Sequence, residues 1–374
     1  MAEPDVERLM QLAPSEEWRQ ALRAAPRHWF VPDVAWTVDE GLIDRQANAE
    51  MWWRAVANLD AIVTQIDDGA SELTAENVQR TPNRSSSCSA PEVVLDFLRL
   101  LDPYPGDRVL EIGTGTGWTT ALLCAYLGAD RVTSIEVDEQ IAAHAKANLE
   151  QAGFGPTMIV GDGVAGSPEQ APFDRVHVTA GTTEIPYTWA EQTRPGGVIV
   201  APWTAVSGAR TKVRLTVTET AAVGRFTGGA AYMMLRGQRP GTPPIEGERR
   251  ESVAHVDPRR IEAAGRGFRI AAAGMLPDVH IMGSGANPVD GTFRLPLREV
   301  HTGSHALAVQ SPNGGRTEVT QTGTRDLWNE LESAYLTWVG WGEPATDRFG
   351  LTVDASGQHV WLDSPDNQIT EVER

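Results

Sequence analysis

A glycine-rich stretch around residue 113 has the spacing of a ligand-binding loop. Residues 109–118 read VLEIGTGTGW, so an apolar run carrying Glu111 leads into three glycines at alternate positions and then into an amphipathic segment. Glycine allows the backbone to approach a ligand closely, as it does where a strand passes through a loop into a helix. A dinucleotide-binding loop would read GxGxxG, but Trp118 stands at its last position. The pattern is GxGxG preceded by an acid, which predicts a different ligand.

Three acidic residues indicate the chemistry of that ligand. Glu111 disfavours a pyrophosphate and suits cationic ammonium and sulfonium centres. Glu136 ends the next apolar run, at 132–136, where a carboxylate can accept hydrogen bonds from both ribose hydroxyls. Asp162 follows the run at 158–160 and could accept from an adenine amino group. Together they predict S-adenosylmethionine, the alternative being a glycine-rich turn with surface acids.

The elements that must position these residues follow a βαβ rhythm from Asp107 onward. Short aliphatic runs alternate with amphipathic segments, which is typical of a parallel sheet whose carboxyl strand ends form the binding crevice. Runs at Val213–Val217 and Ala230–Leu235 could close the sheet as an antiparallel hairpin. The expected fold class is α/β, with a Rossmann-like, mostly parallel sheet.

The flanking regions differ in texture from this centre. Apolar residues at helical spacing, as in 51–66, predict a mostly helical N-terminal region. A segment rich in Pro, Gly and charge predicts a linker, and mixed helix and strand patterns follow it. The expected organisation is a helical region at 1–80, a methyltransferase domain at 81–237, a linker at 238–250 and an α+β domain at 251–374 for peptide recognition.

Composition excludes several classes of protein. The 374 residues carry a formal charge of −18 and lack a basic stripe, so we expect no nucleic-acid partner. No window approaches the ~18 apolar residues that a membrane helix needs, and the N-terminus lacks a secretory pattern, so we expect a cytoplasmic protein with no membrane partner. Cys88 and Cys124 are too few for a disulfide framework or a cysteine-built zinc site, and we expect no metal.

These motifs resemble the protein-L-isoaspartate (D-aspartate) O-methyltransferases. The resemblance covers about residues 85–237 and rests on VLEIGTGTGW at 109–118, GDGVAGSPEQAPFDRVHVTAG at 161–181 and RPGGVIVAPW at 194–203. The second block is the most specific of the three. Ser89-Ala90-Pro91 also matches the family's Ser-Ala-Pro step at the substrate site. The resemblance implies a class I methyltransferase fold and a carboxyl O-methyltransferase that converts S-adenosylmethionine to S-adenosylhomocysteine.

The family pattern implies roles for individual residues. The loop and Glu111 would hold the methionine part of the cofactor, Glu136 the ribose and Asp162 the adenine, while Ser89 would bind the substrate carboxylate as the catalytic residue. Ser89 could also cap a helix, and Ser87 and Cys88 are weaker candidates. The cofactor-binding residues carried over are Glu111, Gly113, Thr114, Gly115, Gly117, Glu136, Asp162 and Gly163.

No general base is expected, because a carboxylate is already ionised at neutral pH. His177 lies in an apolar run, so we interpret it as a packed histidine rather than a catalytic base. Trp328, Trp338 and Trp341 recur at helical spacing and are interpreted as core residues.

Two departures from the family shape the predicted substrate. Glu92 stands where the family usually has His, and residues 250–374 extend beyond the part that resembles the repair enzymes. Longer relatives that modify ribosomally made peptides resemble this C-terminal part. We therefore predict methylation of an Asp side chain in a precursor peptide or protein, leading to a succinimide (aspartimide) or isoaspartate. The alternatives are isoaspartyl repair, a small-molecule carboxyl methyltransferase and a non-catalytic peptide-binding module.

Overall fold

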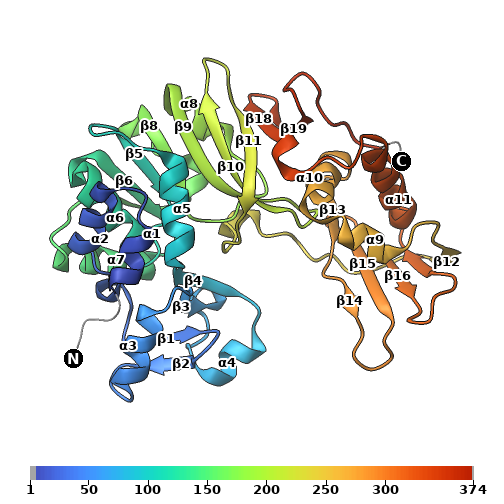
Figure 1. Ribbon diagram of the computed structural model, residues 1–374, viewed down its shortest axis with the longest axis horizontal. Helices are drawn as coiled ribbons and strands as arrows, with labels where there is room; N and C mark the ends of the chain where they lie inside the picture. Colours follow the sequence, from blue (N-terminus) through green and yellow to red (C-terminus); the bar gives the residue numbers. More distant parts are fainter. Residues whose placement is uncertain (1–5, 373–374) are drawn as a thin grey trace. The chain divides into compact units, whose positions relative to one another are not determined.

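The computed structural model describes residues 6–372, which form two compact units (Figure 1). Unit 1 takes the residues up to Ala180 together with Thr188–Ala201 and Thr216–Glu219. Unit 2 takes Gly181–Tyr187, Pro202–Leu215 and the residues from Thr220 onward. Whether the four ranges expected from the sequence fold independently stays a prediction.

A parallel sheet forms the centre of unit 1. Its strand order is β9-β8-β5-β6-β7, and each of these neighbouring pairs is parallel. Helix α5 packs on β8, whereas α6 and α7 pack on β6. The expected α/β class is confirmed. The bounds are β5 Val109–Ile112, β6 Val132–Glu136, β7 Thr157–Val160, β8 Phe173–Val178, β9 Thr193–Thr204, α5 Pro91–Leu101, α6 Trp118–Leu127, α7 Glu139–Gln151 and α8 Tyr187–Glu191.

The N-terminal part of unit 1 contains a second, antiparallel sheet with the order β2-β1-β3-β4. The region expected to be mostly helical, 1–80, therefore contains the expected helices and also three strands that were not predicted. The helical spacing that begins at Met51 ends at the C-cap Asn58, and the β-branched run Ile62–Ile66 forms β3. The bounds are α1 Val6–Leu12, α2 Glu16–Ala24, η1 Arg27–Phe30, β1 Val34–Thr37, β2 Gly41–Asp44, α3 Ala49–Ala57, β3 Ile62–Ile66, α4 Ala75–Arg80 and β4 Arg84–Cys88.

Unit 2, which includes the C-terminal region, contains both strands and helices, as the predicted α+β class for that region implies. The strands β10, β11, β18 and β19 follow one another in one sheet, and a second sheet has the order β12-β17-β16-β15-β13 with β14 on β15. The bounds are β10 Arg210–Val217, β11 Ala221–Gly229, β12 Arg249–Val253, β13 Val279–Ile281, β14 Gly285–Ala286, β15 Phe293–Glu299, β16 His305–Gln310, β17 Glu318–Thr322, β18 Phe349–Asp354, β19 Gly357–Leu362, α9 Pro258–Ala263, α10 Gly265–Met275 and α11 Leu327–Gly340.

The closing hairpin uses a different second strand from the one predicted. Residues 221–229 form β11, which pairs with β18, whereas Ala230–Leu235 holds only an isolated bridge of Met234 to Gly181. β11 contains three glycines, which are uncommon in strands, so its sequence does not predict a strand. Gly224 is required there, because a Cβ on it would lie 1.8 Å from the Arg214 carbonyl oxygen.

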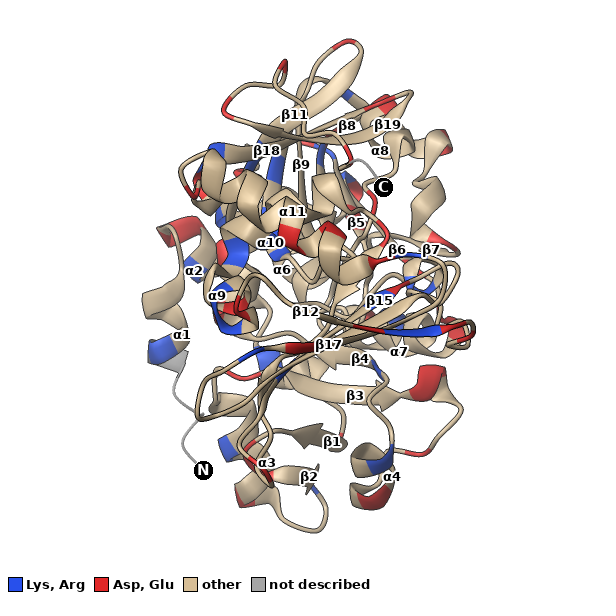
Figure 2. Ribbon diagram, turned by 90° about the vertical axis from the view of Figure 1, so that its right-hand side faces the viewer, with Lys and Arg blue, Asp and Glu red and all other residues tan. Residues whose placement is uncertain are grey.

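Charged side chains are interspersed rather than segregated along the part of the ribbon that is described (Figure 2). Between residues 6 and 372 no helix is long and apolar enough to cross a membrane. The same stretch contains no group of three or more His, Cys, Asp or Glu residues arranged to hold a metal ion. Cys88 and Cys124 are both buried as free thiols.

Candidate active site

The glycine loop turns sharply at the carboxyl end of β5. Gly113, Gly115 and Gly117 have φ angles of +96°, +56° and +89°, a region that side chains rarely adopt. The Gly113 amide donates to the Ile135 carbonyl oxygen of β6 at 2.8 Å. On the other side, a Cβ on Gly113 would lie 2.6 Å from Thr179 Oγ1, just beyond β8. The loop is thus held between the two strands that flank β5, with no room for a side chain at Gly113.

Glu136 lies at the end of β6, directly beside this loop. Its Oε2 accepts from the Gly115 amide at 2.9 Å, and its Oε1 accepts from the Asp138 amide at 3.1 Å. The carboxyl group is almost buried, and this burial raises its pKa above the ordinary value of 4.5, while the two amide donors oppose the shift.

Asp162 and Gly163 follow the end of β7, the next strand in the sheet. Asp162 is exposed, and its Oδ1 accepts from the Val164 amide at 3.0 Å as the cap of a short 3₁₀ turn. Gly163 is buried against β5 and leaves no room for a side chain, since a Cβ there would lie 2.5 Å from Cγ2 of Ile112. The loop, Glu136 and Asp162 therefore occupy adjacent carboxyl strand ends.

Glu111 lies beneath the loop rather than in the crevice. It is 0% exposed, and its Oε2 accepts hydrogen bonds from Thr120 and, at 2.7 Å, from Ser134. Ser134 Oγ lies 2.7 Å from the Thr114 hydroxyl, so a chain of hydroxyls joins the loop to this carboxylate. The expected direct contact of Glu111 with the methionine ammonium stays a prediction, and in this geometry Glu111 fixes β5, β6 and α6 to one another.

His177 is the neighbour of Glu111 across β5 and β8. Its Nδ1 lies 3.9 Å from Glu111 Oε1, and the ring is buried edge-on against Phe97. Within the described residues, neither ring nitrogen has a hydrogen-bond partner. His177 is packed inside the sheet.

The groups at this edge fit S-adenosylmethionine. The N-cap of α6 is Gly117, which makes no side-chain cap bond, so the first turn presents backbone N–H groups that suit the cofactor's carboxylate. Val137 and Val160 are 41% and 53% exposed beside Glu136 and Gly161, and they offer apolar surface for an adenine ring. Neither valine was predicted from the sequence, although Val137 directly follows Glu136 and Val160 stands two residues before Asp162.

Comparison with known proteins agrees with this geometry. A family model described as protein-L-isoaspartate (D-aspartate) O-methyltransferase matches residues 66–233. The enzyme of that name from Methanopyrus kandleri is 37% identical over 162 residues, which cover 41% of this chain and 70% of the relative. Protein-L-isoaspartate O-methyltransferase 2 from Archaeoglobus fulgidus is 33% identical over 199 residues, 52% of this chain and 75% of the relative. The chain belongs to the protein-L-isoaspartate (D-aspartate) O-methyltransferase family.

As a member of this family, the chain is an S-adenosylmethionine-dependent carboxyl O-methyltransferase, and its cofactor and enzyme class are those expected from the sequence. A solved structure titled protein-L-isoaspartate O-methyltransferase aligns over 96% of this chain and 100% of its own, with a TM-score of 0.55 and 19% identity. This likeness concerns the fold. It corrects the expectation that residues 250–374 extend beyond the part shared with these enzymes, since the fold of this one solved chain extends over them.

Ser89 of the methyltransferase lies between the end of β4 and the start of α5. The preceding segment reaches the glycine loop, since a Cβ on Gly115 would lie 3.5 Å from the Ser87 carbonyl oxygen. The N-cap of α5 is Ala90, which makes no side-chain cap bond, so Ser89 does not cap the helix. Across residues 6–372 its hydroxyl has no hydrogen-bond partner, and it is free to bind a substrate. Its catalytic role stays a prediction.

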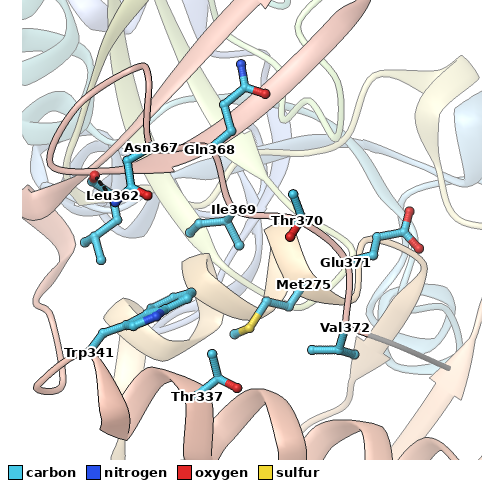
Figure 3. Close-up of a pocket in the computed structure, with 10 residues that line it drawn as sticks. All are labelled: Met275, Thr337, Trp341, Leu362, Asn367, Gln368, Ile369, Thr370, Glu371 and Val372. Atoms are coloured by element: carbon cyan, nitrogen blue, oxygen red, sulfur yellow. Dashed lines mark hydrogen bonds between the residues drawn. The ribbon is translucent and has the colours of Figure 1, made fainter.

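A separate cavity of about 300 Å³ lies in unit 2, between α10, α11, β19 and the segment that follows β19 (Figure 3). Trp341 lines it, whereas Trp328 and Trp338 are buried in the core as expected. None of the predicted cofactor or substrate residues is among those that line this cavity, which are Met275, Thr337, Trp341, Leu362, Asn367, Gln368, Ile369, Thr370, Glu371 and Val372.

The raised pKa of Glu136 predicts how binding depends on pH. If ribose hydroxyls donate to this carboxylate, binding favours its ionised form. Affinity for S-adenosylhomocysteine should then be constant above the Glu136 pKa and should fall by up to about tenfold for each pH unit below it. The fall should begin at a higher pH than for an ordinary glutamate. Calorimetric titrations from about pH 8 to pH 5 would measure it, and an equal pH dependence in Glu136→Gln would contradict this assignment.

Proposed function

We propose that this methyltransferase esterifies the side-chain carboxylate of an Asp in a precursor peptide, and that the ester then closes to a succinimide that can reopen to isoaspartate. The observation that carries this proposal is the approach of the Ser87–Ser89 segment to Gly115. It supports a substrate site at Ser89 directly beside the cofactor loop.

S-adenosylmethionine, when bound, supplies an electrophilic methyl group on a positively charged sulfur. Glu136, the loop amides and the first turn of α6 would hold it, with Asp162 at the adenine. The Ser89 hydroxyl would donate to one oxygen of the substrate carboxylate and leave the other oxygen free to attack the methyl carbon. No proton has to be removed, because the nucleophile is already an anion. The protein contributes alignment and exclusion of water.

The later ring closure balances without a further reagent. The backbone nitrogen of the residue after the methylated Asp attacks the ester carbonyl and loses its proton, and methanol leaves as the five-membered imide forms. Water can then open the imide at either carbonyl. Only the methyl transfer needs Ser89 and the residues that would hold the cofactor.

Glu92 departs from the residue that the family resemblance implies beside the proposed substrate site. It is exposed at the second position of α5, three residues after Ser89, where the family usually has His. An acid there changes the charge that faces a carboxylate-bearing peptide. The net charge of −18 also favours a basic peptide over an acidic one.

Isoaspartyl repair is the second candidate, favoured by the enzymes named above and by the full-length likeness to a solved structure of that title. Aspartate and isoaspartate each carry one free carboxylate, so both can use the same chemistry at Ser89. They differ in the position of that carboxylate relative to the main chain.

A matched set of peptides tests both candidates. A basic peptide would be offered with Asp, isoaspartate or Asn at the same position, together with S-adenosylmethionine. We expect the Asp peptide to gain the mass of one CH₂ group and then, after loss of methanol, to lie one water below its starting mass. Methylation of the isoaspartyl peptide alone would establish repair, and the Asn peptide should remain unchanged.

Replacing Ser89 by Ala should lower kcat about tenfold and leave the dissociation constant of S-adenosylhomocysteine within twofold of wild type. The reason is that one hydrogen bond to a charged oxygen is lost while the cofactor loop is untouched. Ser87→Ala is the matched control and should keep wild-type kcat. An unchanged kcat in Ser89→Ala would remove Ser89 from the mechanism.

A further inference from the structure

Arg27, in η1, is a buried cation without a carboxylate partner. It is 3% exposed, and no ion pair to it occurs within residues 6–372. Its guanidinium donates instead to the carbonyl oxygens of five residues, at 3.2, 2.8, 2.6, 3.3 and 3.1 Å for Val56, Asn58, Asp60, Cys88 and Ser89 respectively. Burying an unpaired charge costs free energy, so neutral acceptors in such number indicate a site where the geometry matters.

The acceptors join segments that are distant in the sequence. Nη2 binds the carbonyls of both Cys88 and Ser89, the residues that lead from β4 into α5. On the other side, the guanidinium carbon lies 5.5 Å from the ring centroid of Trp118, the first residue of α6. Trp118 Nε1 in turn donates to the Ala25 carbonyl oxygen at 3.0 Å. Arg27 therefore ties the Ser89 main chain to the helix that begins immediately after the glycine loop.

The hydrogen bonds of Arg27 hold the Ser89 main chain in a position that the neighbouring residues do not fix by themselves. The N-cap of α5 is Ala90, and no side chain makes a cap bond to the start of this helix. The Ser89 hydroxyl is therefore not held in one direction by a bond to α5. A guanidinium donating to the Ser89 carbonyl fixes the main chain from which that hydroxyl projects. The same guanidinium places a positive charge next to the Ser89 peptide group. In this weakly polar environment the charge acts more strongly on a substrate carboxylate than it would in water. Glu92 and the net charge of −18 act in the opposite direction.

We propose that Arg27 is a positioning residue for methyl transfer, which holds Ser89 in register with the cofactor loop and offsets the negative charge around the substrate carboxylate. This inference rests on the proposed role of Ser89. It assigns a task to a residue that touches neither substrate nor cofactor and lies 62 residues before Ser89.

Arg27→Lys tests the inference, because lysine keeps the charge and loses the planar set of donors. With the peptide that wild type methylates, we expect kcat to fall about tenfold and KM for the peptide to rise, with the dissociation constant of S-adenosylhomocysteine within threefold of wild type. In a Ser89→Ala background the same substitution should lower kcat less than twofold, since the hydroxyl that it positions is gone. A tenfold loss in both backgrounds would overturn the proposal.

Arg175→Lys is the matched control. Arg175 is also buried, at 5% exposed, and donates to the carbonyl oxygens of Leu101 and Asp102, both at 3.0 Å. It pairs with Val109 at the start of β5, opposite the glycine loop. This control should lower the midpoint of thermal unfolding and keep kcat. Equal losses of kcat in the Arg27 and Arg175 variants would reduce Arg27 to a structural role.

A second variant covers the case in which Arg27→Lys does not fold. Trp118→Phe removes the bond to Ala25 and loosens Arg27 without deleting it, and it should lower kcat in the same manner; an unchanged kcat in this folded variant would overturn the inference. Absence of methylation of any Asp or isoaspartyl peptide by wild type would instead refute the proposed function. If wild type methylates the peptide but the losses of kcat from Arg27→Lys and Ser89→Ala are additive in the double variant, only the role of Arg27 is refuted.

Discussion

Gly113→Ala should abolish measurable binding of S-adenosylhomocysteine and lower the free energy of unfolding by about 3 kcal/mol, because strained backbone costs about 1–3 kcal/mol and a steric clash is added. The φ angle of Gly113 is +96°, and the new Cβ would lie 2.6 Å from Thr179 Oγ1. Thr179 cannot yield easily, since its hydroxyl donates to the Ile112 carbonyl oxygen at 3.0 Å and also to that of Gly113. Calorimetry and urea unfolding would measure the two effects.

Gly153→Ala separates backbone strain from the clash. Gly153 has a φ angle of +83°, but no atom lies within 4 Å of the position of its Cβ. This control should lose about 1 kcal/mol of stability and keep full cofactor affinity. If Gly113→Ala bound S-adenosylhomocysteine as tightly as this control does, the loop would not be the cofactor site.

Glu136→Ala should weaken binding of S-adenosylhomocysteine about 100-fold. Two ribose hydroxyls donating to a carboxylate are each worth about 1.5–3 kcal/mol, and part of this is offset because the free carboxylate already accepts from Gly115 and Asp138. The remaining loss of about 2.7 kcal/mol corresponds to the expected factor. Isothermal titration calorimetry of the folded variant measures it directly.

Glu139→Ala is the control for charge alone. Glu139 is exposed at the first position of α7, three residues after Glu136, and no hydrogen bond joins it to the loop within the described residues. Its removal changes the net charge of the protein by the same amount and should leave affinity within twofold. Equal losses in the two variants would mean that Glu136 acts through the general field rather than by contact with the ribose.

The central fold could be predicted from the sequence because its signals are local. The runs that became β5 and β6 end in glycine or an acid, and parallel strands in a βαβ order must bring their carboxyl ends to one edge. The antiparallel N-terminal sheet could not be predicted in this way. Ile62, Val63 and Ile66 suit either a helix face or a strand, and pairing with β1 and β4 decided between them.

By itself, the sequence determined which residue types meet at the carboxyl edge of the parallel strands: the glycines that can adopt positive φ, Glu136 and Asp162. Only the tertiary structure decided that Glu111 is sealed below them and that Arg27 holds Ser89. Both outcomes depend on donors and acceptors far apart along the chain, such as Ser134 with Glu111 and Arg27 with Ser89. Spacing in a sequence records periodicity within an element, whereas the partner of a buried charge is chosen by packing between elements.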